Sequence, residues 1–219
     1  MVKDGYWYGL PLVLVAGGLF SFGLYWPGSF FWLGGCFFLV LAALVLNFFR
    51  DPEREIPTDP GAIISPADGR VVEIGDEDFE GRPVRRVSIF MSPLDVHVNR
   101  SPIAGTIGAV VYRRGTFRIA SEARASVENE QNVFTVAGDQ GVVVAKQIAG
   151  AVARRIVFWR KSGDVVMRGE RVGLIKFGSR VDVLMELGIE MRVKIGDRVR
   201  AGASILATCQ PPEDGRLVH

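Results

Sequence analysis

An uncharged stretch over residues 5–49 limits what the N-terminal part of this chain can form. The turn-forming sequence Trp26-Pro27-Gly28-Ser29 divides it into two apolar segments, residues 7–26 and 30–49. About 20 apolar residues in a helix cross the roughly 30 Å hydrocarbon core of a bilayer. The sequence therefore predicts a transmembrane helical hairpin over residues 1–49. A signal peptide fits less well, because it has one shorter apolar region and a small-residue cleavage site.

Basic residues beside the hairpin predict its orientation. Lys3 precedes the first segment, Arg50 and Arg54 follow the second, and the turn between the segments has no basic residue. Lys and Arg collect on the cytoplasmic side of membrane proteins. We therefore expect the chain at the cell (inner) membrane, with both hairpin ends and the following domain in the cytoplasm. The alternative is a hairpin that enters the bilayer without crossing it and still holds the domain at its surface.

The next segment, residues 50–60, is predicted to be a linker, because three prolines between 51 and 60 exclude a continuing helix. A net charge of +2 gives no reason to expect a nucleic-acid partner. The two cysteines, Cys36 and Cys209, lie in no CxxC or Cys/His cluster, so no metal site is predicted.

Residues 61–219 have the pattern of a soluble, mainly β domain. Short runs rich in β-branched residues alternate with glycine-containing turns, which is typical of an all-β sandwich or barrel. The runs lie at residues 70–74, 84–91, 106–112, 141–148, 152–159, 172–177, 181–185 and 190–195. One weak helical pattern covers residues 119–129.

Two segments, residues 64–72 and 193–202, resemble turns of the biotinyl and lipoyl carrier domains, which form a flattened barrel called a barrel-sandwich hybrid. Gly196 and Gly202 flank the second turn, where a positive φ angle favours glycine. The resemblance implies a barrel-sandwich-hybrid-like fold. It does not imply a carrier role, because the lysine-bearing tip of a carrier domain is not present.

Histidine is the usual side chain for proton transfer near neutral pH, and the chain has two. His219 is the final residue, so an acid or base role for histidine falls on His97. Prolines at 93 and 102 bracket the segment around His97 and limit it to a short strand, in which Asp95 and His97 would share one face. A single histidine on a strand is more often structural, so this residue alone predicts no mechanism.

Gly178 and Ser179 form the second candidate, since they lie between two apolar β runs where the turn must be tight. In a strained peptide the serine hydroxyl can attack the carbonyl that precedes it. An ordinary glycine turn explains the pair equally well, because the chain has 26 glycines and a second Gly-Ser pair at residues 28–29.

Five motifs in order resemble those of the phosphatidylserine decarboxylase proenzymes, in their short bacterial and archaeal form. They are Asn-Phe-Phe-Arg-Asp-Pro at 47–52, Pro-Ala-Asp-Gly at 66–69, Asp-Val-His-Val-Asn-Arg at 95–100, Asn-Glu at 129–130 and Phe-Gly-Ser at 177–179. The resemblance spans residues 47–209. One position departs from the long bacterial members, whose histidine motif reads His-x-x-His: here Arg100 stands at the second position. It stays open whether His97 serves both self-cleavage and turnover or shares one task with Arg100.

The resemblance implies a self-cleaving enzyme that depends on a covalent pyruvoyl group. Ser179 would attack the Gly178 carbonyl and split the chain into a β chain, 1–178, and an α chain, 179–219, which begins with pyruvoyl. His97 would act as base and later as proton donor, with Asp68 orienting it. The mature enzyme would decarboxylate phosphatidylserine to phosphatidylethanolamine, a step of phospholipid biosynthesis, without a metal ion.

The implied partners are phosphatidylserine in the membrane and the two fragments, which would stay together as a heterodimer; a homo-oligomer is left open. One alternative substrate is archaetidylserine, the ether-lipid analogue with the same headgroup. A soluble amino acid is a further alternative, against which the hairpin argues. A non-enzymatic, membrane-tethered carrier-like domain would explain the hairpin and the β pattern, but not Phe-Gly-Ser, Asp68 and His97.

Overall fold

The computed structural model describes residues 1–26, 28–116, 128–150, 155–176 and 179–209. The chain divides into two compact units, Met1–Glu53 and Arg54–His219. The first is helical and the second is built from β-strands, so each is described by itself.

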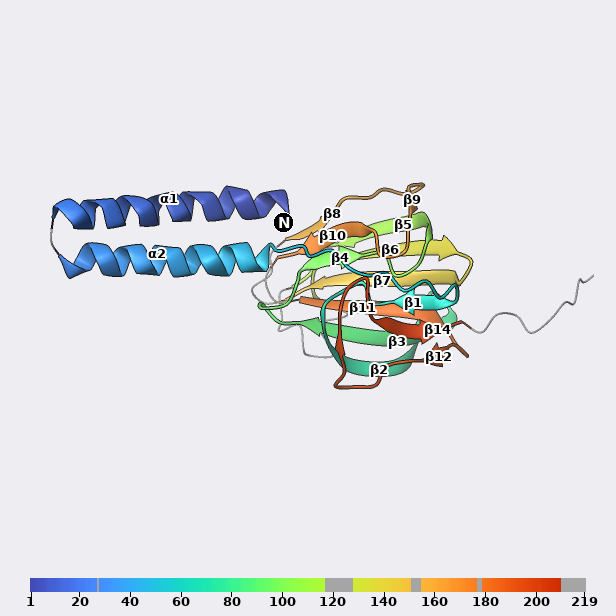
Figure 1. Cartoon of the computed structure of the whole chain (residues 1–219). Helices are drawn as coiled ribbons and strands as arrows, with labels where there is room; N and C mark the ends of the chain where they lie inside the picture. Colours follow the sequence, from blue (N-terminus) through green and yellow to red (C-terminus); the bar gives the residue numbers. More distant parts are fainter. Residues whose placement is uncertain (27, 117–127, 151–154, 177–178, 210–219) are drawn as a thin grey trace, which may run out of the picture. The chain divides into compact units, whose positions relative to one another are not determined.

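The N-terminal unit is an antiparallel pair of helices, α1 (Lys3–Tyr25) and α2 (Ser29–Phe48) (Figure 1). Small residues lie where the helices touch: Gly9 faces Leu46, and Gly35 faces Phe20. Small residues at a helix contact allow the two backbones to approach closely. Both helices are long and apolar enough to cross a membrane. The predicted helical hairpin is confirmed, and each helix begins and ends slightly earlier than expected.

The second unit is mainly β, as the sequence predicted. Its strands have the following bounds: β1 (Ala62–Ile64), β2 (Gly69–Phe79), β3 (Arg82–Met91), β4 (Val98–Arg100), β5 (Gly105–Arg113), β6 (Gln131–Gly138), β7 (Gly141–Ala149), β8 (Ile156–Phe158), β9 (Val165–Val166), β10 (Arg171–Ile175), β11 (Ser179–Glu186), β12 (Glu190–Met191), β13 (Arg198–Val199) and β14 (Ile205–Thr208).

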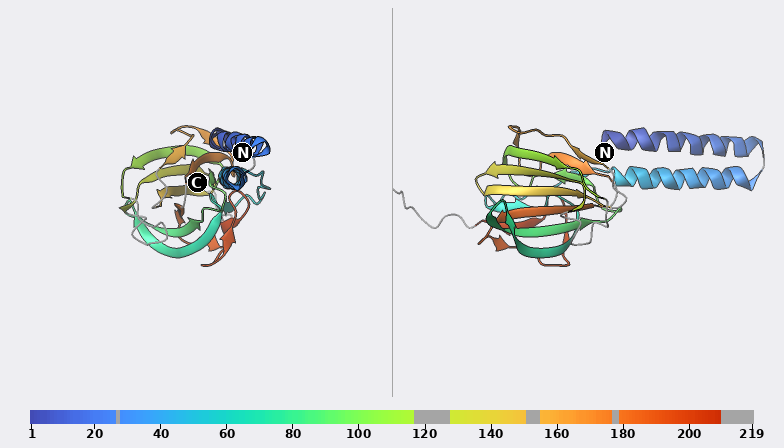
Figure 2. Two further views of the ribbon diagram at one scale, coloured as in Figure 1. Left: turned by 90° about the vertical axis from the view of Figure 1, so that its left-hand side faces the viewer. Right: turned by 180° about the vertical axis from the view of Figure 1, so that it is seen from behind.

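The strands of the described residues form three sheets, and neighbouring strands run antiparallel. The large sheet has the order β13-β2-β3-β11-β7-β6-β5-β9, and two smaller sheets have the orders β1-β14-β12 and β4-β10-β8. Figure 2 shows the large sheet from two further sides and its curvature. Strand β11 lies near its centre, paired along its length with β3 and β7.

The main hydrophobic core lies on one face of the large sheet, against residues of the smaller sheets. From β11 it takes Val181, Val183 and Met185, which alternate along the strand and are almost fully buried. The intervening side chains of β11 face the other side of the sheet, because side chains alternate along a strand. There Leu184 packs in a smaller apolar cluster with Val133 and Val144.

The large sheet curls toward this second face. Strands β2 and β5 are five places apart in the sheet, yet Glu77 of β2 and Arg113 of β5 line one cavity of about 360 Å³. Neighbouring strands are about 4.8 Å apart, so a flat sheet would separate these strands by about 24 Å. Curvature therefore makes the second face a hollow, which is the barrel-like feature of the fold.

Most of the expected β runs are confirmed. The run at 190–195 is a strand only over Glu190–Met191, because the chain turns at Gly196. Strand β6 was not expected. The positive φ angles of Gly196 (98°) and Gly202 (79°) confirm the predicted turns. The weak helical pattern at 119–129 lies almost entirely outside the described residues.

Residues after Arg54 follow the surface of the β unit closely. The guanidinium of Arg168 donates hydrogen bonds to the carbonyls of Pro57, Asp59 and Ala62. Arg168 thus holds the residues that lead into β1. The C-terminal half of the expected linker is therefore attached to the β unit.

Candidate active site

Ser179 is the first residue of the central strand β11. It is fully buried and lies between Met91 of β3 and Ala149 of β7 in the ladder. Its hydroxyl contacts the sulfur of Met91 at 3.3 Å. A thioether is a weak hydrogen-bond acceptor, so this contact orients the hydroxyl without binding its proton strongly. Gly178, on the other side of the expected scissile bond, lies outside the described residues.

The Asn-Glu motif holds the strand beside Ser179. Asn129 is buried and donates its side-chain amide to the Ala149 carbonyl at 2.7 Å, while the Ala149 N–H donates to the Glu130 carbonyl at 2.9 Å. Ala149 is the ladder partner of Ser179 on β7. The motif therefore fixes the strand end against which Ser179 is paired.

His97 lies just before β4 and is almost fully buried. Its Nδ1 atom is 2.9 Å from the backbone carbonyl of Asp95. A carbonyl only accepts, so this bond places a proton on Nδ1 and makes Nε2 the basic nitrogen of the neutral ring. The group that orients the imidazole through Nδ1 is therefore a backbone atom.

The prediction that Asp95 and His97 share one face of a strand is wrong. Residues 92–95 form a turn, in which the Asp95 carboxylate accepts the Ser92 N–H at 2.8 Å, and β4 begins only at Val98. The physical reason is the Ser-Pro-Leu-Asp sequence, since Pro fixes φ and lacks a donor, and Ser and Asp bind their own backbone in turns.

The segment from Met91 to His97 contacts the chain on both sides of the expected cleavage site. The Met91 sulfur contacts the Ser179 hydroxyl, and the His97 carbonyl accepts the N–H of Ile175 at 3.3 Å. Ile175 ends β10, four residues before Ser179. The turn at 92–95 thus lies between two contacts, one with Ser179 and one with the end of β10 that precedes the expected cleavage site.

Asp68 lies in the loop before β2 and joins three segments. Its carboxylate pairs with Arg54 at 2.8 Å and accepts the Ala201 N–H at 2.7 Å. The same loop contacts the histidine motif through Pro66, whose carbonyl accepts the Arg100 N–H at 2.9 Å. Arg54 is a partner of Asp68 that sequence reasoning missed.

Arg100, at the position where long relatives have histidine, is buried and donates from Nη1 to the Gly169 carbonyl at 2.9 Å. Its side chain also passes close to Gly202, where a Cβ atom would collide with it. Arginine stays protonated at any physiological pH, so this residue is a structural donor and a poor base.

A row of buried side-chain amides runs toward Ser179 from β6. Asn132 donates to Gln147 at 2.9 Å, and Gln147 donates to Asn99 at 2.8 Å. The amide of Asn99 then lies 3.9 Å from the Met91 sulfur, the same atom that contacts Ser179. Sequence reasoning noted Asn99 only as part of a motif and missed the other two, which have no local signal.

The opposite face of β11 carries a second polar group. Arg180 is almost fully buried, and its guanidinium contacts Asp182 at 2.6 Å, Ser88 at 2.6 Å and Glu73 at 3.1 Å. Sequence reasoning gave these residues no role. The available signal was an arginine and an aspartate alternating with valines in a strand, a pattern that predicts a buried ion pair.

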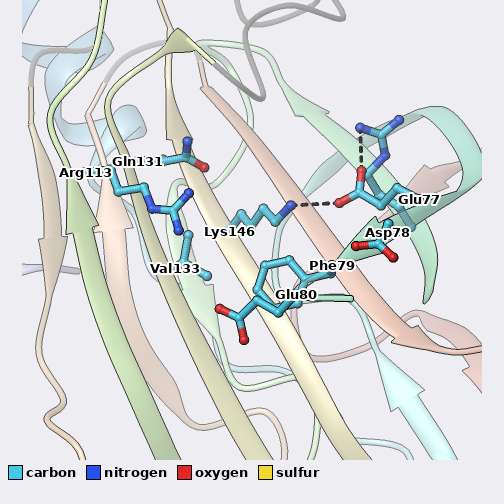
Figure 3. A pocket seen from close by; sticks show the side chains of 9 residues that line it. Glu77, Asp78, Phe79, Glu80, Arg113, Gln131, Val133 and Lys146 are labelled. Carbon is cyan, nitrogen blue, oxygen red and sulfur yellow. Dashed lines mark hydrogen bonds and ion pairs between the residues drawn. The ribbon is translucent and has the colours of Figure 1, made fainter. Parts of the chain in front are cut away.

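Figure 3 shows the cavity on this face, with Lys146 of β7 reaching Glu77 of β2. Acidic and basic residues both line it, together with Phe79 and Val133. Because three acidic and three basic residues line it, the cavity has no single sign of charge that would select a ligand.

Two other site types find no support in the described part of the chain. No group of three or more His, Cys, Asp or Glu residues there could hold a metal ion. Burial, with Glu186 nearby, raises the pKa of the Cys209 thiol, so this cysteine stays protonated near neutral pH and is a weak nucleophile.

Comparison with known proteins defines first a class and then a family. Three relatives are named phosphatidylserine decarboxylase proenzyme, so the class is decarboxylating enzymes made as precursors. The relative from Solibacter usitatus is 55% identical over 180 residues, covering 80% of this chain and 86% of its own length. That from Salinibacter ruber is 47% identical over 203 residues, covering 89% of each chain. That from Burkholderia lata is 44% identical over 190 residues, covering 85% and 84%.

The model of the phosphatidylserine decarboxylase family matches residues 41–207. The chain therefore belongs to the phosphatidylserine decarboxylase family, and it is an enzyme, a carboxy-lyase. This confirms the resemblance drawn from the five motifs.

Proposed function

We propose that this chain cleaves itself between Gly178 and Ser179, carries a pyruvoyl group at residue 179 and decarboxylates phosphatidylserine to phosphatidylethanolamine. The observation that carries the proposal is the place of Ser179, a fully buried serine at the start of a central strand beside the histidine segment. Membership of the family supports the substrate, which is the one its relatives are named for.

Cleavage begins with attack of the Ser179 hydroxyl on the Gly178 carbonyl. The C–O bond of an ester forms while the peptide C–N bond breaks, and the hydroxyl proton leaves to a base. Elimination then releases the carboxylate of Gly178 as a new C-terminus, and addition of one water to the remaining unsaturated residue gives the ketone and ammonia. The weak Met91 contact suits this step, because little hydrogen-bond energy opposes transfer of the proton.

His97 is the proposed base. The Asp95 carbonyl fixes its ring with Nδ1 protonated, which leaves Nε2 to take the serine proton. Asp68 is proposed to support this step through the loop that it braces, since its oxygens bind Arg54 and Ala201 and the same loop contacts β4 at Pro66.

The surroundings of Ser179 fit a pyruvoyl group, because the position is fully buried and the buried Asn99 amide approaches the Met91 sulfur that Ser179 contacts. Once formed, the group supplies a ketone that takes up the electrons released when the substrate carboxylate leaves as CO₂. The chain's own residues then have two tasks. Burial keeps water from the reacting carbon, and His97 returns a proton to it through Nε2.

The helical hairpin supports a lipid substrate, because a membrane anchor confines enzyme and lipid to one surface. We propose residence in the cell membrane with residues 54–219 on the cytoplasmic side, from Lys3, Arg50 and Arg54. An impermeant thiol reagent applied to intact cells should label a cysteine that replaces Ser29 and spare one in the β unit, in a background without Cys36 and Cys209. The reverse pattern would contradict this orientation.

The function itself is tested on the purified wild-type chain. Mass spectrometry should find a fragment of 41 residues, 179–219, whose N-terminus is blocked to amine reagents. Vesicles of phosphatidylserine should then yield phosphatidylethanolamine and CO₂. An intact chain that is fully active would refute the mechanism. Activity confined to archaetidylserine vesicles would keep the mechanism and replace the substrate.

A further inference from the structure

A line of six alternating charges begins at Asp182 and Arg180 of β11. From Arg180, paired with Asp182, it continues through Glu73 to Arg86, from Arg86 to Glu77 at 3.2 Å, and from Glu77 to Lys146 at 2.7 Å. Three acids and three bases thus follow one another across β11, β2, β3 and β7 and end in the cavity of Figure 3. Each inner member has an opposite charge on both sides.

The proposed cleavage divides this line between the two fragments. Arg180 and Asp182 belong to fragment 179–219, and the other four members belong to fragment 1–178. The guanidinium of Arg180 makes two contacts with the other fragment, one with Glu73 and one with Ser88. Its third partner, Asp182, is on its own strand.

The buried end of the line is the end beside residue 179. The side chains of Arg180 and Asp182 are 1% and 0% exposed, whereas Glu73 and Glu77 are 37% and 23% exposed. The second carboxylate oxygen of Asp182 has no hydrogen-bond partner in the described residues. Ion pairs in such surroundings are weakly screened, and a buried charge without its partner is strongly disfavoured. The guanidinium therefore has one favourable position.

We infer that Arg180 is a positioning residue: its contacts with Glu73 and Ser88 hold the new chain end so that the reactive carbonyl at residue 179 keeps its place during turnover. The inference rests on the proposed function. Before cleavage, peptide bonds on both sides hold residue 179, whereas afterwards one side is a chain end that can fray. Side chains at 179 and 180 face opposite sides of the sheet, so a fixed guanidinium restrains rotation of the strand end.

The test replaces a partner of Arg180 and leaves Arg180 itself in place. Glu73→Gln removes the charge that Arg180 contacts across the division, and Ser88→Ala removes the neighbouring acceptor. Asp76→Asn is the matched control, because Asp76 pairs with Arg85 in the same β2–β3 hairpin and this pair contains no buried partner, its side chains being 34% (Arg85) and 54% (Asp76) exposed. Cleavage, kcat and KM are measured for each purified protein on phosphatidylserine in mixed micelles.

We expect Glu73→Gln to cleave fully and to lose about tenfold in kcat with KM within about twofold, since a displacement of about 1 Å can cost about 10²-fold in rate. Ser88→Ala should show the same split with a smaller loss, and Asp76→Asn should match wild type. Arg180→Lys keeps the positive charge but lacks the planar guanidinium, so it should retain only part of the wild-type kcat.

Two results would overturn the inference. One is a kcat for both Glu73→Gln and Ser88→Ala that equals that of Asp76→Asn. The other is a lower melting temperature with kcat unchanged, which would make the contact structural alone. A wild-type chain that stays in one piece would instead refute the proposed function, so the two failures are distinguishable on one denaturing gel.

Discussion

The two faces of β11 have different chemistry over its first four residues and similar chemistry beyond them. On one face Ser179 contacts the Met91 sulfur, which the buried Asn99 amide also approaches, and on the other Arg180 and Asp182 form ion pairs. Further along, Val183 and Leu184 are fully buried in two apolar clusters. At the start of β11, the Ser179 hydroxyl is therefore held by a weak contact, and its neighbour Arg180 is held by ion pairs.

This difference has a physical basis. A hydroxyl that must lose its proton is best held by a weak acceptor, whereas a chain end that must not move is best held by a charge in a buried site. Alternation of side chains allows adjacent residues to meet both needs without sharing partners. The following variants test this division of roles.

Removal of the nucleophile should have the largest effect. Ser179→Ala should leave one intact chain on a denaturing gel, with no detectable decarboxylation, because neither ester nor ketone can form. The fold should survive, since only a buried hydroxyl that contacts a thioether is lost. A cleaved Ser179→Ala chain would place the reaction at another residue.

Loss of the proposed base should come next. His97→Ala should accumulate uncleaved chain, with processing slowed about 10²- to 10⁴-fold, the usual contribution of general base catalysis. A time course on denaturing gels measures this rate. If the variant cleaves normally but forms little phosphatidylethanolamine, His97 serves only turnover. Normal cleavage with normal turnover would remove it from the site.

Asp68→Ala should have an intermediate effect. The change takes from Arg54 its carboxylate partner and from the Ala201 N–H its acceptor, in a largely buried place. Hydrogen bonds to charged groups contribute about 1.5–3 kcal/mol each, so we expect a lower melting temperature and slower processing. Asp59→Ala, a more exposed carboxylate before β1, is a suitable control. Wild-type processing of Asp68→Ala would exclude Asp68 from the mechanism.

We expect the smallest effect on cleavage at residues 183 and 184, where both faces of β11 are apolar. Val183→Ala and Leu184→Ala each leave a void in an apolar cluster and should destabilise the fold by about 2–3 kcal/mol. Both should still cleave completely at low temperature. Urea unfolding and a denaturing gel give the two measurements. A cleavage defect in either variant would extend the functional region beyond residue 182.

Several parts of this structure could be predicted from local sequence. Residues 5–49 lack charge over two helix lengths, and the β runs alternate, so the hairpin and most strands follow from patterns within one segment. The run expected at 181–185 lies within β11, which begins two residues earlier at Ser179. Strand β6 was missed because Gln131 and Asn132 open it with polar side chains, although both are buried.

The contacts of the site could not be predicted, because they join distant segments. Asp68 was expected to orient His97, which stays a prediction, and the contacts described for its carboxylate are with Arg54 and with Ala201, 133 residues further along the chain. The Nδ1 atom of His97 is oriented by a backbone carbonyl, and because every residue has one, the sequence carries no signal for this contact. Asp95 was placed on a strand because the prolines at 93 and 102 were taken to bracket a short strand, whereas residues 92–95 form a turn.

The place of β11 in the sheet also bears on the order of folding and processing. Residues 179–209 supply β11 between β3 and β7, β13 beside β2, and β14 beside β1 with β12 on its other side. Under the proposed cleavage, the uncut precursor folds by an intramolecular reaction, whereas a denatured mature enzyme must find its missing strands by collision. Dilution should therefore abolish refolding of the mature enzyme and leave refolding of Ser179→Ala unaffected. The peptide bond between residues 178 and 179 would then assist folding once, before it is cleaved.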